Sequence, residues 1–354
     1  MSRLASWYSS PRARSWTRPW QPTGAQAFHR SLPGYAPTPL TPVPALASEL
    51  GVGRVLVKDE SSRLGLPAFK VLGASWACRR VLEEHPGSTL VTATDGNHGR
   101  AVARMAALLG VHATVFVPRV MRRATAAQIA QEGADVVWVD GDYDVAVQRA
   151  AAFVHERPDC ELVQDTAWDG YEEVPAWIVE GYRTLLDEVD SQLDVPANLV
   201  AVPVGVGSLA EAVVRHHRRP GFAHPSVLSV EPDTAACVLA SLAAGRPVTV
   251  QTGETVMAGL NCGTISSAAW PVLRDGCDAA IAVSDAEALR AADDLRRLGI
   301  SSGPSGAATL AGVRAAIADP VRRAELDLGP EAVVVLLSTE GRMSSADLGF
   351  RDQP

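Results

Sequence analysis

Residues 89–165 alternate between short apolar strands and helical segments, and this alternation restricts the fold more than any other feature of the sequence. The strands are "TLVTAT", "HATVFVP", "ADVVWVD" and "CELVQD". The segments between them have the apolar spacing of helices, and Gly110 and Gly133 follow two of them as end signals. Strands joined by helical crossovers pair in parallel. The segment therefore predicts a parallel sheet wrapped by helices.

A second alternating series follows a long helix expected at residues 176–193. Its strands are predicted at 198–204, 226–232, 279–284 and 332–338. Two α/β units thus lie side by side, and the cleft between them is the expected ligand site. Within this series, "HHRR" at 216–219 is interpreted as a solvated helix end, because adjacent histidines do not share a helix face. No metal site is predicted.

Composition excludes several classes of protein. The 354 residues include 40 acidic and 32 basic side chains, so the net charge of −8 argues against nucleic acid or an anionic membrane as the main partner. No apolar run is long enough to span a bilayer, and the N-terminus lacks the apolar core of a secretory signal. The five cysteines have no CxxC spacing, as expected of reduced thiols in a cytoplasmic protein. The tryptophans at 7, 16 and 20 are expected to dock an N-terminal arm on the body of the protein or on a second subunit.

Lysine is nearly absent from the chain. Only Lys58 and Lys70 occur, and all the other side chains counted among the 32 lysines and arginines are arginine. An arginine cannot lose its proton in a protein, whereas a lysine amine can become a nucleophile or a base. Lys70, in "GLPAFKVLGAS", is therefore the candidate for covalent chemistry, although a lysine whose stem covers apolar surface is the commoner case. Lys58 is expected to be structural.

Three loops at strand ends carry polar groups or glycines. In "PVGVGSLAEA", Gly205 and Gly207 precede a helix, a setting in which backbone amides approach an anion. The third glycine of a dinucleotide fingerprint is replaced by Ala210, so a single phosphate fits better than a pyrophosphate. "TATDGNHG" ends a strand with Asp95 and Asn97, either of which is equally suited to cap the next helix.

The third loop, "LLSTEG", ends a strand with the hydroxyls of Ser338 and Thr339. A reactive lysine, a single-phosphate loop, a strand-end asparagine and a strand-end hydroxyl together describe a site for pyridoxal 5′-phosphate (PLP). In this interpretation the lysine forms the Schiff base and the loop holds the phosphate. The asparagine meets the ring hydroxyl, and the neutral hydroxyl meets the pyridine nitrogen.

The sequence resembles the fold-type II PLP enzymes, the tryptophan synthase β-subunit superfamily, and within them the diaminopropionate ammonia-lyase branch. The resemblance runs from about residue 28 to 341 and is carried by these segments: "LGLPAFKVLGASWA", "ATDGNHGRAVA", "VQDTAWDGYEEVPAWIVEGY", "PVGVGSLA", "MAGLNCG", "GPSGAA" and "LLSTEG". Asp95, where the superfamily usually has serine, and "QDTAWDGY" indicate the ammonia-lyase branch.

The resemblance implies a role for each site residue. Lys70 would be the Schiff-base lysine and Asn97 the ring-hydroxyl partner. Ser338, or its neighbour Thr339, would face the ring nitrogen. Asp95 and Asp165 would be catalytic carboxylates facing the substrate. The phosphate cup would consist of Gly205, Val206, Gly207, Ser208 and Leu209.

The same resemblance implies the fold and the domains. We expect two three-layer α/β domains with mostly parallel sheets and the active site in the cleft between them. Residues 1–45 would form an N-terminal arm, 46–74 and 175–354 a large PLP-binding domain, and 75–174 a small α/β domain. The expected partners are a small amino-acid substrate and a second copy of the chain in a homodimer.

The implied reaction is PLP-dependent β-elimination of 2,3-diaminopropionate, or a close β-substituted amino acid, to pyruvate and ammonia. The alternatives are a serine/threonine dehydratase-like or β-replacement enzyme and, from another class, a non-catalytic ligand-binding member of the fold. Relatives commonly differ at Pro67 and at Arg342–Met343, and they often have a glutamate just before the Ser-Gly-Ala stretch, where this chain has Gly303–Pro304. These departures bear on the substrate.

Overall fold

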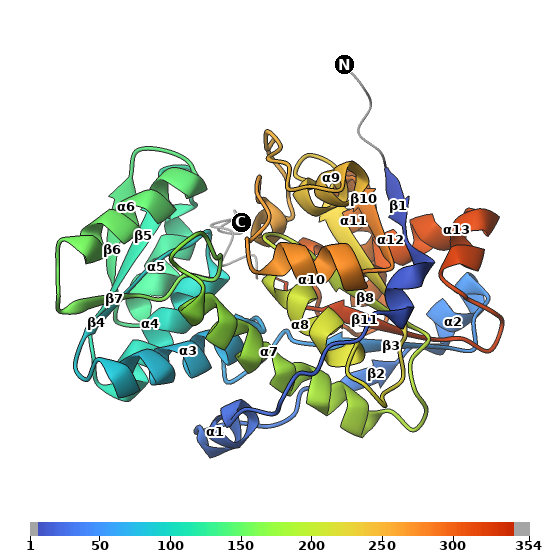
Figure 1. Ribbon diagram of the computed structural model, residues 1–354, viewed down its shortest axis with the longest axis horizontal. Helices are drawn as coiled ribbons and strands as arrows, with labels where there is room; N and C mark the ends of the chain where they lie inside the picture. The colour runs from blue at the N-terminus through green and yellow to red at the C-terminus, as the bar shows by residue number, and fades with distance from the viewer. Residues whose placement is uncertain (1–5, 343–354) are drawn as a thin grey trace, which may run out of the picture.

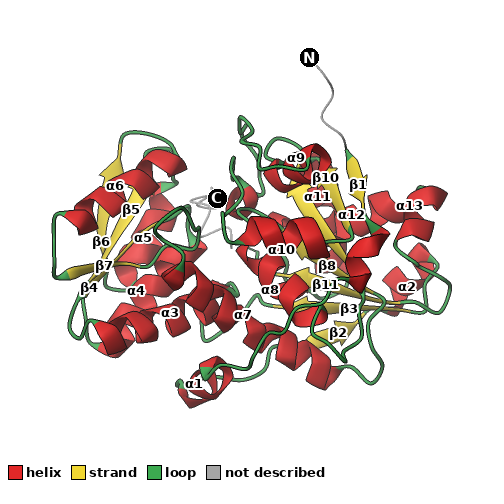
Figure 2. Ribbon diagram, in the orientation of Figure 1, coloured by secondary structure: helices red, strands yellow, loops and turns green. Residues whose placement is uncertain are grey.

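A computed structural model describes residues 6–342 of the chain, which form two α/β lobes (Figure 1, Figure 2). One lobe is built on a seven-stranded sheet of order β1-β10-β9-β8-β11-β3-β2, and the other on a four-stranded sheet of order β6-β5-β4-β7. The strands of the larger sheet are β1 (Trp7–Ser9), β2 (Leu40–Pro42), β3 (Arg54–Asp59), β8 (Leu199–Pro203), β9 (Ser226–Pro232), β10 (Ala279–Val283) and β11 (Val333–Ser338). The strands of the smaller sheet are β4 (Thr89–Ala93), β5 (Ala113–Pro118), β6 (Asp135–Val139) and β7 (Cys160–Leu162).

The smaller sheet confirms the strand–helix alternation read from the sequence. Its strands all pair in parallel, and each apolar segment predicted as a strand is one. The helices around it are α3 (Lys70–Glu84), α4 (Asn97–Leu109), α5 (Arg123–Gln131) and α6 (Tyr143–His155). The helices of the larger lobe and the long helix between the lobes are α1 (Ala25–Ser31), α2 (Pro44–Leu50), α7 (Glu173–Gln192), α8 (Ser208–His217), α9 (Cys237–Ala244), α10 (Ala269–Gly276), α11 (Asp285–Arg297), α12 (Pro304–Ile317) and α13 (Pro320–Glu325).

The larger sheet is parallel in its interior and antiparallel at both edges. β1 pairs antiparallel with β10, and β2 pairs antiparallel with β3. Both edge strands come from residues expected to form an arm, so the N-terminal segment is part of the sheet. The tryptophans of this segment pack on the body of the same chain, as the first of the two expected arrangements requires. Trp7 Nε1 donates to Glu325 Oε2 at 2.9 Å, and the guanidinium of Arg183 lies 5.3 Å from the centre of a Trp20 ring.

Helices α3 and α7 join the two lobes. α7 lies between them in Figure 1, and Trp76 Nε1 of α3 donates to Glu180 Oε2 of α7 at 2.9 Å. The buried imidazole of His29 contacts both helices, through the Leu72 carbonyl at 2.9 Å and the Thr184 hydroxyl at 2.7 Å. These contacts fix the start of α3, where Lys70 lies, against the larger lobe.

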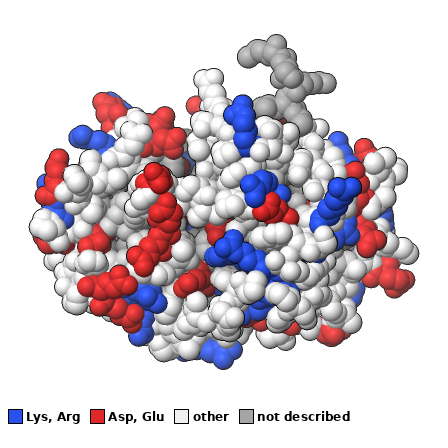
Figure 3. Space-filling view, viewed as in Figure 1, with Lys and Arg blue, Asp and Glu red and all other residues white. Residues whose placement is uncertain are grey.

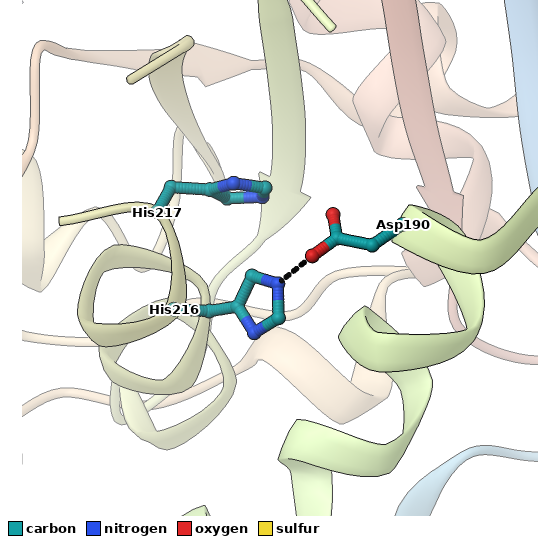
Figure 4. A group of neighbouring side chains, drawn as sticks. All are labelled: Asp190, His216 and His217. Atoms are coloured by element: carbon teal, nitrogen blue, oxygen red, sulfur yellow. Dashed lines mark hydrogen bonds and ion pairs between the residues drawn. The ribbon is translucent and has the colours of Figure 1, made fainter. Parts of the chain in front are cut away.

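The "HHRR" segment at 216–219 is buried, so its interpretation as a solvated helix end is wrong. His216 and Arg218 are 0% exposed. Arg218 forms an ion pair with the buried carboxylate of Asp278, and His216 Nε2 donates to Asp190 Oδ2 at 2.7 Å (Figure 4). The partners that make burial possible come from distant parts of the chain, and for this reason the local sequence does not reveal it.

This helix end also brings three ligand-type side chains together. Asp190, His216 and His217 each place one ligand atom within 4.8 Å of the others. However, a guanidinium nitrogen of Arg219 lies 3.1 Å from His216 Nε2. Burial is the main cause that holds the pKa of His217 well below its usual value. The positive groups around this imidazole, chiefly His216 and Arg218, lower the pKa further. An environment that opposes a proton also opposes a metal cation, and we assign the cluster to packing.

The positions of the strands can be compared with the expected domain boundaries. Every strand of the smaller sheet falls within 75–174, and every strand of the larger sheet falls outside this range. The full boundaries stay a proposal, and their ends at 1–5 and 343–354 lie outside the described residues.

Within 6–342, no helix has both the length and the hydrophobicity that crossing a bilayer requires. Acidic and basic side chains are interspersed over the face shown in Figure 3.

Candidate active site

Lys70 is held at the junction of the two lobes. It is the first residue of α3, and the segment before it is fixed to the end of β11. The Phe69 N–H donates to the Thr339 carbonyl at 3.1 Å, and Ala68 forms an antiparallel bridge with Glu340. The Lys70 side chain is 21% exposed, so its amine reaches a partly open space.

Asp165 is the direct partner of Lys70. The Lys70 amine donates to Asp165 Oδ2 at 2.5 Å. Burial opposes the charge of both groups, but their mutual attraction outweighs it: the pKa of Lys70 is raised and that of Asp165 is lowered. Asp165 follows β7, and its backbone carbonyl accepts a hydrogen bond from the Ser208 hydroxyl at 2.6 Å. The structure therefore brings Lys70, Asp165 and the start of α8 together, as the sequence interpretation requires.

Asp95 has an environment unlike that of Asp165. Burial first, and then the negative charge of Asp165, raise the pKa of Asp95 to about 7. Asp95 does not cap α4, and neither does Asn97. Thr94 Oγ1 instead accepts from the backbone N–H groups of Gly96 at 2.9 Å and Gly99 at 3.0 Å. The capping alternative considered for Asp95 and Asn97 is thus wrong.

Asn97, the first residue of α4, reaches across the cleft. Its side-chain nitrogen donates to Glu340 Oε2 at 2.8 Å. Asn97 belongs to the smaller lobe and Glu340 follows β11 of the larger lobe. This hydrogen bond therefore connects the two lobes at the site.

The loop at 205–209 is shaped to receive an anion. Among the described residues, no group accepts a hydrogen bond from the backbone N–H groups of Gly205, Val206 and Gly207. Gly207 has φ +103°, a conformation that side chains disfavour, and a Cβ there would lie 3.1 Å from Ala269 Cβ. The loop leads directly into α8, whose first residues are Ser208 and Leu209. Free amides and a helix N-terminus together favour a phosphate-sized ligand.

Ser338 and Thr339 lie where β11 ends beside Lys70. Ser338 is 0% exposed, and its hydroxyl lies 2.7 Å from the hydroxyl of Ser302. Thr339 is also buried, and its carbonyl holds Phe69 as described above. The Ser338 hydroxyl is thus paired with another hydroxyl at this end of the strand.

Three further residues of the site were not identified from sequence. The Nδ1 atom of His98 lies 3.9 Å from Asp165 Oδ2 and has no hydrogen-bond partner among the described residues. Tyr182 packs its ring on Phe69 with 4.8 Å between ring centres, and its hydroxyl is likewise without a partner there. Glu340, within "LLSTEG", is the third of these residues, and its carboxylate contacts Asn97. Only the position of His98, directly after Asn97, offered a local signal.

Comparison with known proteins decides the family. A family model described as "Pyridoxal-phosphate dependent enzyme" matches residues 31–340. The chain belongs to this family. The PLP enzyme is similar to the diaminopropionate ammonia-lyase of Escherichia coli (strain K12), with 36% identity over 354 aligned residues that cover 90% of this chain and 87% of the relative.

Solved structures agree with this assignment. The diaminopropionate ammonia-lyase from Escherichia coli in complex with D-serine superposes with a TM-score of 0.85 and 33% identity, covering 95% of this chain and 93% of that one. The same enzyme in complex with an aminoacrylate–PLP azomethine reaction intermediate gives a TM-score of 0.82 and 34% identity, covering 96% and 92%. The predictions of a fold-type II PLP enzyme and of PLP-dependent elimination are confirmed, and the chain is a PLP-dependent lyase.

The residues of this PLP lyase fit the cofactor. The loop at 205–209 offers unpaired amides in a space that a Cβ at Gly207 would obstruct. Lys70 offers an amine at the junction of the two lobes, and Asn97 and Ser338 offer polar groups on either lobe. The phosphate, the aldehyde carbon, the ring hydroxyl and the ring nitrogen of PLP thus each have a complementary group among these residues.

Proposed function

We propose that this lyase eliminates ammonia from 2,3-diaminopropionate, or a close β-substituted amino acid, and yields pyruvate and ammonia. The observation that carries the proposal is the Asp165 carboxylate, which holds the Lys70 amine at 2.5 Å and lies near enough to Asp95 to raise the pKa of that second carboxyl group. A serine or threonine substrate has one ammonium group, whereas diaminopropionate has two. A site with two carboxylates suits the second positive charge.

Asp165 is the proposed binding group for the substrate's β-ammonium. In the structure this carboxylate already holds a cation, the Lys70 ammonium at 2.5 Å. Burial opposes the charge of Asp165, and the nearby Lys70 cation nevertheless lowers its pKa; the substrate's β-ammonium would take the place of that cation. The β-nitrogen therefore stays protonated at Asp165 and leaves as ammonia without a further proton donor.

Lys70 and Asp95 are the proposed groups that move the α-proton. PLP, when bound, supplies the electron sink that stabilises the negative charge left at the α-carbon. Lys70 would accept the α-proton on one face of the substrate, which we assign to the L isomer. Asp95, with a pKa near neutrality, is suited to accept it on the other face. The released aminoacrylate hydrolyses to pyruvate and ammonia.

A substrate panel distinguishes the proposed reaction from a dehydratase. We expect kcat/KM for 2,3-diaminopropionate to exceed that for serine of the same configuration by about 10- to 100-fold, the worth of one hydrogen bond to a charged group. The measurement is ammonia and keto acid release from both isomers of diaminopropionate and serine and from L-threonine. Higher kcat/KM with threonine would favour the dehydratase alternative. A protein that binds PLP and releases neither product would favour the non-catalytic one.

The phosphate is proposed to rest on the amides of residues 205–209, and Gly207→Val tests this placement. A side chain at Gly207 would strain a backbone of φ +103° and would press on Ala269 at the base of the loop. We expect PLP affinity to fall by at least about 100-fold, since the substitution would remove more than one charge-assisted hydrogen bond between the loop and the phosphate. The measurement is a PLP titration followed by absorbance.

Gly110→Val is the matched control for this variant. Gly110 also has a positive φ, of +72°, but an added Cβ would meet nothing within 4 Å. Its backbone strain should lower stability by about 1 kcal/mol while PLP affinity stays that of the parent. Unchanged PLP binding in Gly207→Val would rule out the placement of the phosphate.

A homodimer and a cytoplasmic location are also part of the proposal. The homodimer rests on the resemblance to the fold-type II PLP enzymes, and the location rests on the five cysteines, all of which are free thiols in the structure. Sedimentation equilibrium of the purified holoenzyme tests the dimer, and a mass of one chain at micromolar concentration would contradict it.

A further inference from the structure

The backbone of Glu340 is fixed on two sides. The Gly303 N–H donates to the Glu340 carbonyl at 3.0 Å, and Ala68, two residues before Lys70, forms an antiparallel bridge with Glu340. The next residue, Gly341, donates its N–H to the Pro67 carbonyl at 2.8 Å. The position from which the Glu340 side chain starts is therefore set by the same contacts that fix Lys70.

The carboxylate of Glu340 determines the orientation of the Asn97 amide. A carboxylate oxygen accepts hydrogen bonds, and the side-chain nitrogen of Asn97 donates to it at 2.8 Å. Rotating the amide by half a turn would set the Asn97 oxygen against a negative charge. The amide has two N–H bonds, and only one is used by Glu340. The second N–H is left for a ligand in the cleft.

Gly303 leaves room for this carboxylate. It precedes α12 with φ −74° and ψ 169°, a conformation that any residue adopts. The backbone therefore does not require glycine. A Cβ at Gly303, however, would lie 2.8 Å from Glu340 Oε1 and 2.9 Å from the Gly341 carbonyl oxygen. The space at Gly303 and the carboxylate of Glu340 thus form one arrangement.

We propose that Glu340 is a positioning residue, which occupies the space left by Gly303 and holds the Asn97 amide with its free N–H available to the ring oxygen of PLP. This inference rests on the proposed role of Asn97. It links residues that are 243 positions apart and belong to different lobes. It also gives Gly303, a departure from the relatives' pattern, a function.

A set of single and double variants tests the inference through PLP binding. Glu340→Ala is expected to weaken PLP affinity by about 10- to 100-fold, the loss typical when a partner that orients a ligand-binding group is removed. It should also shift the absorption maximum of the bound cofactor. Glu340→Gln, which keeps an acceptor oxygen and the side-chain volume, should recover most of the affinity. Gly303→Ala should resemble Glu340→Ala because the methyl group displaces the carboxylate.

The double variant decides whether Glu340 acts through Asn97. If it does, Asn97→Ala combined with Glu340→Ala binds PLP as weakly as Asn97→Ala alone. Additive losses would overturn the inference, and so would parental affinity and absorption maximum in Gly303→Ala and Glu340→Ala. Far-UV circular dichroism checks folding, and if Glu340→Ala does not fold, the Gln and Gly303 variants give the answer. If Asn97→Ala alone binds PLP with the parental affinity, the proposed role of Asn97 itself is wrong. This result is distinct from failure of the Glu340 variants alone.

Discussion

Replacing Lys70 with arginine is expected to abolish elimination, with a loss of at least about 10⁴-fold in kcat. Arginine keeps a positive charge beside Asp165, so the ion pair at the start of α3 persists. A guanidinium cannot lose its proton and cannot form the covalent link to PLP. The measurement is pyruvate release under saturating PLP. Activity within tenfold of the parent would contradict the assignment.

Borohydride reduction gives the complementary measurement on the unmodified holoenzyme. Peptide mapping should place the pyridoxyl group on Lys70, and a label on Lys58 would overturn the assignment. The structure gives a reason to expect none there. The Lys58 amine is buried and donates to the Thr38 carbonyl, Glu188 and Gln192 at 2.7 to 3.0 Å, which uses all its N–H groups.

Lys58→Met is the matched control for both measurements. Removing the amine leaves the Glu188 carboxylate buried with one fewer partner, a change expected to cost about 3–5 kcal/mol of stability. Arg63 still pairs with the same carboxylate at 2.7 Å, so the protein keeps part of this network. The variant should be less stable than the parent, yet the folded fraction should still be labelled at Lys70.

Replacing Asp95 with asparagine is expected to lower activity toward D-diaminopropionate by two to four powers of ten, about the effect of losing a general base. Activity toward the L isomer should fall less because Lys70 remains. Asparagine keeps the shape of the side chain but takes no proton at neutral pH. Since Thr94 caps α4, the substitution leaves the helix start intact. Equal losses with both isomers would assign Asp95 to substrate binding.

The pH dependence gives an independent test of Asp95. Burial and the charge of Asp165 raise its pKa to about 7, and a base must be deprotonated to act. For the D isomer, kcat/KM should therefore decrease as pH falls below about 7, and Asp95→Asn should lack this decrease. Absence of any D activity in the parent enzyme would remove the need for a second base.

Thr94→Val is the control that separates base loss from disruption of the loop. It removes the hydroxyl that accepts from Gly96 and Gly99, and leaving these N–H groups unpaired is expected to cost about 1–3 kcal/mol of stability. Any displacement of the loop should affect both isomers equally. Only Asp95→Asn should change the ratio of D to L activity.

The regular elements of the interior were predictable because their signals are local. Four apolar runs between residues 89 and 165 became the strands of the smaller sheet, and the helices between them follow their apolar spacing. The near absence of lysine marked Lys70, and two glycines marked the phosphate loop. The strand, helix and glycine signals lie within about ten residues of sequence, the range over which strand and helix periodicity operate, whereas the rarity of lysine is a property of the whole chain.

The edges of the larger sheet were not predictable in the same way. β1 and β2 have three residues each, and β2 contains Pro42. Such short segments have too few positions to show a period of two, and they become strands because β10 and β3 offer unpaired backbone groups. The burial of residues 216–219 is a similar case, since Asp190 and Asp278 neutralise that helix end from distant positions.

The sequence by itself determined the α/β class, and it singled out Lys70 and the glycine loop at 205–209 as candidates for the site. Only the tertiary structure decided that Thr94 and not Asp95 caps α4, and that Glu340 holds Asn97 across 243 residues. It also decided that His98 and Tyr182 each bury a polar atom that has no partner within residues 6–342. The physical reason is range: secondary structure follows from neighbouring side chains, whereas a hydrogen-bond partner is chosen by whichever groups the packing of two lobes brings within about 3 Å.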